Sequence, residues 1–124
     1  MQPKSWLAVA AVSALLAVAL GAFGAHALKN SLSGELFEVF EVGVRYHMYH
    51  ALGLGLVALA GWVRAELSIS GPAWLLLVGT VVFSGSLYLL ALTDTRWLGA
   101  ITPIGGTAFL AGWAWLAWSA LRLP

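Results

Sequence analysis

The stretch WLLLVGTVVFSGSLYLLALT, residues 74–93, contains no charged side chain and is long enough to cross a lipid bilayer as a helix. Three further apolar stretches run over about residues 6–25, 51–63 and 98–121. The stretch at 51–63 reaches spanning length only when residues 46–50 are counted with it. Because a helix is one of only two structures that satisfy their own backbone in lipid, we predict an all-α integral membrane protein with four transmembrane helices.

The composition agrees with a membrane protein and excludes several other classes. Hydrophobic residues make up 61% of the chain and charged residues 9%, against roughly 25% charged residues in soluble domains. The net charge of +1 and the lack of a basic run give no indication of a nucleic-acid partner. The chain has no cysteine, which excludes disulfides and thiolate metal sites.

The four spans and their short connections use nearly the whole chain, so we predict a single transmembrane domain over residues 1–124. The spans form two helical hairpins. We place them at approximately residues 6–26, 45–63, 73–93 and 97–121.

A short amphipathic helix is expected before the second span, at approximately residues 34–43. Its acids recur every three residues and its apolar side chains fall on the other side, a pattern typical of a helix lying at the membrane surface. Glu41 and Arg45 are four residues apart with the acid first, which favours an ion pair on one helix face.

Two features bear on how the helices pack. Pro103 lies near the start of the fourth span and either begins that helix or kinks it. Small residues recur at spacing four, as in Ala17-Gly21-Ala25, and such ridges allow close helix contact within one chain or between copies of the chain. Lys and Arg number three on each side of the membrane, so they give no orientation.

Polar residues gather on one side of the predicted bundle, where helices 1 and 3 end and helices 2 and 4 start. All three histidines are there. Ionisable residues at membrane depth are costly, so a binding site is the default hypothesis. The alternative is structural, because His and Tyr are also comfortable at the headgroup level. The candidate ligand-binding residues are His26, Glu41, Arg45, His47, His50 and Tyr88.

A metal or haem site is a second hypothesis for the same region. His47 and His50 share a helix face, and His26 approaches from another helix, so His26, His47 and His50 are the candidate metal ligands. Two histidines three residues apart form a permitted but nonspecific ligand set. We therefore expect no cofactor, with haem or a metal as the alternative.

Four strings in combination resemble a known family of small membrane proteins. They are GAFGAHAL at residues 21–28, RYHMYHAL at 45–52, FSGSLY at 83–88 and TPIGG at 102–106. Together they resemble domain-of-unknown-function family 423, whose animal relatives are called transmembrane protein 256. The resemblance implies a multi-pass protein of the bacterial plasma (inner) membrane. It implies no known reaction, and so assigns no role to any residue.

From these observations we expect a non-enzymatic binding or accessory protein. Its one-sided polar cluster would hold a lipid headgroup or a small ligand, or would dock a partner. The expected partners are membrane lipids, with a homo-oligomer or a larger membrane complex as further possibilities and no nucleic acid. The alternatives are a haem- or metal-binding protein and an oligomeric transporter or channel whose path is lined by the Pro103 break.

Overall fold

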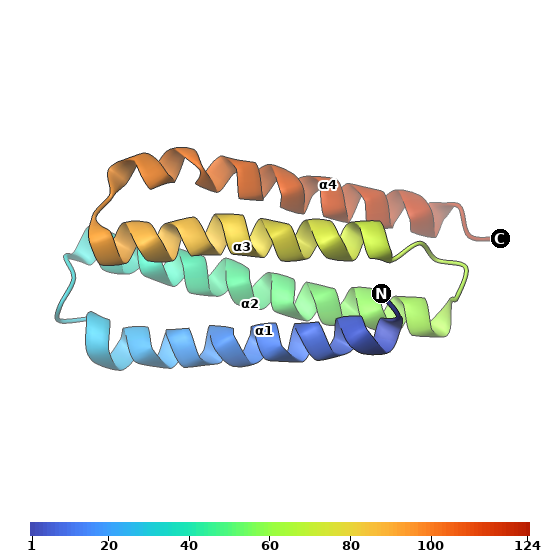
Figure 1. Cartoon of the computed structure of the whole chain (residues 1–124), viewed down its shortest axis with the longest axis horizontal. Coiled ribbons are helices and arrows are strands. Elements are labelled where there is room, and N and C mark those ends of the chain that lie inside the picture. The colour runs from blue at the N-terminus through green and yellow to red at the C-terminus, as the bar shows by residue number, and fades with distance from the viewer.

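The computed structural model describes all residues 1–124 and contains only helices. Four long helices run up and down, so that both chain termini lie at the same end (Figure 1). We call this the terminal end, and the opposite end the polar end. The helices are α1 (Pro3–Phe23), extended by the π-helical turn η1 (Gly24–Leu28), then α2 (Gly34–Val63), α3 (Ser70–Thr93), and α4 (Thr102–Leu121), which follows the 3₁₀ turn η2 (Arg96–Ala100).

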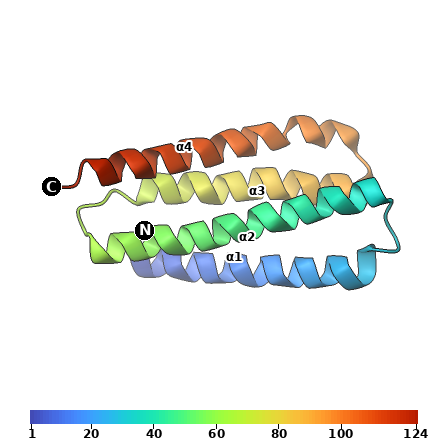
Figure 2. The ribbon, with the colours of Figure 1, turned by 180° about the vertical axis from the view of Figure 1, so that it is seen from behind.

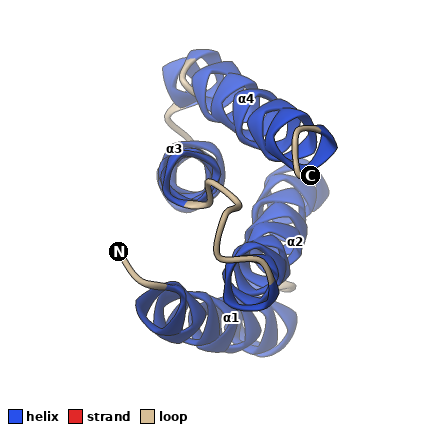
Figure 3. Cartoon of the chain, turned by 90° about the vertical axis from the view of Figure 1, so that its right-hand side faces the viewer, coloured by secondary structure: helices blue, strands red, loops and turns tan.

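Each helix packs mainly on its neighbours in sequence, so α1 and α4 lie at the two edges of the arrangement (Figure 3). The same order is seen from behind, with α2 and α3 in the middle (Figure 2). Helices α1 and α3 meet through side chains at the terminal end, where the rings of Trp6 and Trp74 lie edge to face with centroids 5.1 Å apart. A groove between α1 and α3 lies next to this contact, lined by residues 9–16 of α1 and 77–88 of α3.

Three segments are long and apolar enough to span a membrane: Pro3–Leu28, Ser70–Thr93 and Arg96–Leu121. Helix α2 lies between α1 and α3, but its two histidines and two tyrosines reduce its apolarity. Large apolar side chains on the outside of the bundle are exposed, as expected for a surface that faces lipid. The all-α architecture with several membrane spans is thus confirmed.

The short amphipathic helix predicted at residues 34–43 is joined to the second span. These residues are helical, but they continue without a break into α2, which is 30 residues long. Ser33 caps its start by accepting a hydrogen bond from the Leu36 backbone N–H at 3.2 Å. Leu36 and Phe40 are buried in the bundle, so the first turns of α2 pack on other helices.

The start of the fourth span also departs from the simple prediction. Asp94 ends α3 in the left-handed conformation, with φ of 52°, and η2 then precedes α4. Pro103 occupies the first turn of α4, where its missing N–H costs no hydrogen bond. Two roles were predicted for Pro103, and the structure shows the first: Pro103 begins the helix.

The small-residue ridges are used inside this chain. Gly21 faces Val44 of α2, and Gly112 faces Leu76 of α3. A Cβ on Gly105 would lie 2.4 Å from the backbone nitrogen of Phe83, so α3 and α4 touch almost backbone to backbone there. Close approach of this kind is what holds helices together in lipid.

Candidate functional site

The predicted site residues lie between the middle of the bundle and its polar end, but they form separate groups. His47 and Tyr88 face the groove between α1 and α3, and His50 faces α4. Glu41 and Arg45 line a small hollow against α1, and His26 lies exposed in η1. The single cluster that the sequence suggested is therefore not formed.

His47 is buried and connects three helices. Its Nδ1 lies 2.9 Å from the Tyr88 hydroxyl on α3, and its Nε2 lies 3.2 Å from the Ser13 hydroxyl on α1. Both ring nitrogens thus have partners. The space for the Tyr88 ring is left by Gly43, where an added Cβ would lie 2.9 Å from the ring.

This chain of three side chains forms part of the wall of a groove of about 300 Å³. Its polar lining comes from Ser13, His47, Thr80, Ser84 and Tyr88, and the rest is mainly apolar side chains of α1 and α3. Thr80 and Ser84 donate to backbone carbonyls, those of Leu76 at 2.8 Å and Gly43 at 2.7 Å. Their hydroxyls are therefore occupied within the protein.

His50 has a different environment from His47. Its Nδ1 lies 2.7 Å from the Tyr46 carbonyl oxygen in its own helix. Its ring stacks on Phe109 of α4, with centroids 3.4 Å apart and planes 6° from parallel. Tyr46, Phe83 and Phe109 form an aromatic cluster around it. This is the environment of a side chain that joins α2 to α4.

The structure does not bring together His26, His47 and His50, the three predicted metal ligands. No group of three His, Cys, Asp or Glu residues in the structure is close enough to hold a metal ion. His26 lies exposed in η1, whereas His47 and His50 are buried and directed to different helices. The three histidines therefore do not form one ligand set.

Glu41 and Arg45 line a hollow of about 110 Å³ at the polar end, together with residues of α1 and η1. The ion pair predicted between them is not formed, since the ion pairs of the structure involve only Arg64 and Arg96. Both side chains are exposed. The hollow thus has an acid and a base on one wall, and neither is neutralised by a partner.

Glycines on the α1 side let α1 and η1 pack closely on α2 beside this hollow. An added Cβ on Gly24 would lie 2.5 Å from the Phe40 ring, and one on Gly21 would lie 3.2 Å from Val44. The π-helical turn η1 begins at Gly24, directly beside the hollow. Such turns occur often at functional sites. The full lining is Gly21, Gly24, Ala25, Phe40, Glu41, Val44 and Arg45.

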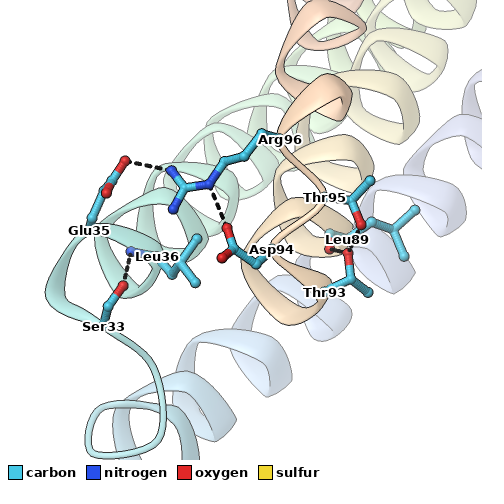
Figure 4. A network of polar contacts seen from close by, with 8 residues as sticks. All are labelled: Ser33, Glu35, Leu36, Leu89, Thr93, Asp94, Thr95 and Arg96. Carbon is cyan, nitrogen blue, oxygen red and sulfur yellow. Dashed lines mark hydrogen bonds and ion pairs between the residues drawn. The ribbon is translucent and has the colours of Figure 1, made fainter.

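An exposed ionic network at the polar end was not predicted from the sequence. Arg96 donates to Glu35 at 2.7 Å and also to Asp94, linking the start of α2 to the turn between α3 and α4 (Figure 4). Glu35 and Arg96 are 61 residues apart, and nothing in the sequence connects them. Ser13 was missed for a similar reason, because a lone serine in an apolar span has no distinguishing pattern.

Comparison with known proteins gives a consistent result. Residues 20–106 match the family described as protein of unknown function (DUF423). The chain is 47% identical over 120 residues to the UPF0382 membrane protein YwdK of Bacillus subtilis, covering 96% of this chain and 98% of that protein. It is 40% identical over 123 residues to the UPF0382 inner membrane protein YgdD of Escherichia coli, covering 99% and 94%. No solved structure matches the chain.

Proposed function

We propose a non-enzymatic role for this chain, which belongs to the UPF0382 (DUF423) family of bacterial membrane proteins. In this role it binds a phospholipid headgroup in the hollow beside Glu41 and Arg45. The observation that carries this proposal is the pair itself. A base and an acid one helical turn apart line the same hollow without pairing with each other.

The chemistry fits a zwitterionic headgroup that carries a phosphate and an amine. An arginine guanidinium is a fixed positive charge that donates paired hydrogen bonds to phosphate oxygens. A carboxylate one turn away accepts hydrogen bonds from an ammonium group. Arg45 would therefore take the phosphate and Glu41 the amine, as in a phosphatidylethanolamine headgroup.

The depth of the hollow fits the same ligand. The segment Pro3–Leu28 is 26 residues long, which is about 39 Å of helix against a hydrocarbon layer of about 30 Å. With this segment centred in the bilayer, Gly24 lies close to the boundary between the hydrocarbon and the headgroups. The Arg45 side chain can extend from there toward the phosphate layer.

The test is native mass spectrometry of the protein released from nanodiscs of phosphatidylethanolamine and phosphatidylglycerol in equal amounts. We expect the unmodified protein to retain one phosphatidylethanolamine. Arg45→Gln should lose retention of both lipids, because the phosphate contact is common to them. Glu41→Gln should lose only the preference for the amine-bearing lipid.

Lys29→Gln provides the matched control, since Lys29 is an exposed cation at the same end but does not line the hollow. It should retain lipid as the unmodified protein does. Retention that is the same in Arg45→Gln and in the unmodified protein, with the variant correctly folded, would show that this hollow does not bind a headgroup.

A further inference from the structure

In the groove between α1 and α3, Ser13, His47 and Tyr88 form a hydrogen-bond chain. This chain has one more donor proton than it has hydrogen bonds. A neutral imidazole has one N–H, and each hydroxyl has one O–H, so Ser13, His47 and Tyr88 together carry three donor protons. The two contacts of His47 use two of them. Whichever ring nitrogen carries the proton, one hydroxyl at an end of the chain is left with a proton to donate.

No acceptor within the protein takes this proton. Hydroxyls in helices commonly donate to the carbonyl one turn earlier, as Thr80 does to Leu76. Ser13 and Tyr88 make no hydrogen bond other than those to His47. Ser13 is only 7% exposed, Tyr88 is partly buried, and both line a largely apolar groove, where leaving a donor unpaired is costly.

The Ser13 end of this hydrogen-bond chain lies near the middle of the membrane. Ser13 is within three residues of the midpoint of Pro3–Leu28, which is about 4 Å along the helix axis. The polar headgroups are about 15 Å away from this level, at the edge of a hydrocarbon layer about 30 Å thick. A headgroup therefore does not reach the Ser13 end of this chain, and an occupant that pairs there must bring its acceptor oxygen into the hydrocarbon region.

We infer that the groove binds an apolar, lipid-soluble molecule through a carbonyl oxygen, which accepts the spare hydroxyl proton of Ser13 or Tyr88. The groove supplies about 300 Å³ with a largely apolar lining, in which only the chain of Ser13, His47 and Tyr88 has a donor proton left over. A long-chain ketone and an alkylated quinone share this chemistry. The site shares no residue with the headgroup hollow and does not depend on it.

The probes are 10-nonadecanone labelled with ¹³C at its carbonyl and a decyl-substituted benzoquinone labelled likewise, each added to the full chain in nanodiscs. A carbonyl that accepts a hydrogen bond absorbs in the infrared at lower frequency than a free one. We expect a shifted band that saturates at one equivalent of probe. A shifted band with both probes would mean that the groove accepts a carbonyl of either kind. A shifted band with the quinone alone would mean that the ligand is a quinone whose ring carbonyl accepts the hydrogen bond.

Two variants separate this hydrogen bond from mere fit to the groove. Ser13→Ala combined with Tyr88→Phe removes both hydroxyls at little cost in shape, and it should weaken binding about fivefold to tenfold and abolish the shifted band. Thr80→Val is the matched control, because Thr80 lines the same groove but its hydroxyl is already used by Leu76. It should keep both the affinity and the band.

The proposal fails if neither labelled carbonyl shows a shifted band with the unmodified protein, since the groove then holds only acyl chains. It also fails if the folded double variant shows the same band as the unmodified protein. Loss of lipid retention in Arg45→Gln, with the carbonyl band unchanged, would still support this site, because the two sites are independent.

Discussion

The imidazole of His50 lies flat on the ring of Phe109, with the centroids 3.4 Å apart. This contact joins α2 to α4, which are not neighbours in sequence, and Phe109 is 5% exposed. Phe109 also packs against Gly79 of α3, where an added Cβ would lie 2.6 Å from its ring. Three helices therefore share one aromatic side chain.

Phe109→Ala should destabilise the bundle by about 3 kcal/mol, since it removes a buried ring and leaves a cavity beside His50 and Gly79. The free energy of unfolding can be measured by titration with a denaturing detergent in mixed micelles. Leu110→Ala is the control, because Leu110 is 73% exposed and faces outward. Equal losses in the two variants would mean that Phe109 does not hold the helices together.

Gly105→Ala should destabilise the protein by about 1–3 kcal/mol, because the new methyl group would meet the backbone of α3 and force α3 and α4 apart. The adjacent Gly106 is the matched control. A Cβ there would make only an ordinary contact with Phe83 at 3.8 Å. Gly106→Ala should therefore be neutral or slightly stabilising through its helix propensity. The same detergent titration compares them, and a reversed order would contradict the packing described.

Ser84→Ala should cost about 1 kcal/mol, because the Ser84 hydroxyl donates to the Gly43 carbonyl across the α2–α3 interface at 2.7 Å. Thr107→Val serves as control, since the Thr107 hydroxyl bonds only within its own helix, to Pro103, and is exposed. We expect a smaller change for Thr107→Val. Equal stability of Ser84→Ala and the unmodified protein would show that this hydrogen bond contributes nothing net.

Arg96→Gln should lower the thermal midpoint only slightly at low salt and not at all at 1 M salt. The ion pairs of Arg96 with Glu35 and Asp94 are exposed, and exposed pairs are weak and screened. Circular dichroism melts of the two proteins at both salt concentrations provide the measurement. A large loss that persists in high salt would mean that Arg96 has a packing role.

Much of the fold follows from the sequence. Uncharged runs such as residues 74–93 identify the helices, and four short strings indicate the family that the comparisons confirm. The amphipathic pattern of residues 34–43 set them apart from the second span, whereas Gly43 is tolerated inside the helix and Phe40 is buried, so the two form one helix. Backbone continuity depends on burial, which charge patterning does not report.

The site was predicted less well than the fold. Residues 47 and 50 are three apart in one helix, yet His47 reaches α1 and α3 while His50 reaches α4. The rotation of α2 about its axis decides this. That rotation is set by contacts such as Gly43 with Tyr88, which join residues far apart in sequence. A single sequence therefore identifies the polar residues of a bundle, but it does not predict which of them contact one another.

The length of the uninterrupted α2 also bears on the membrane thickness that suits the protein. Arg45 and Arg64 enclose only uncharged residues in this helix and its end, and they are about 28 Å apart along the axis. A bilayer of matching width leaves both guanidinium groups at its surfaces, whereas a thicker one must thin locally or draw one of them inward. With α2 as a span, we expect the protein to be least strained in membranes of about this thickness.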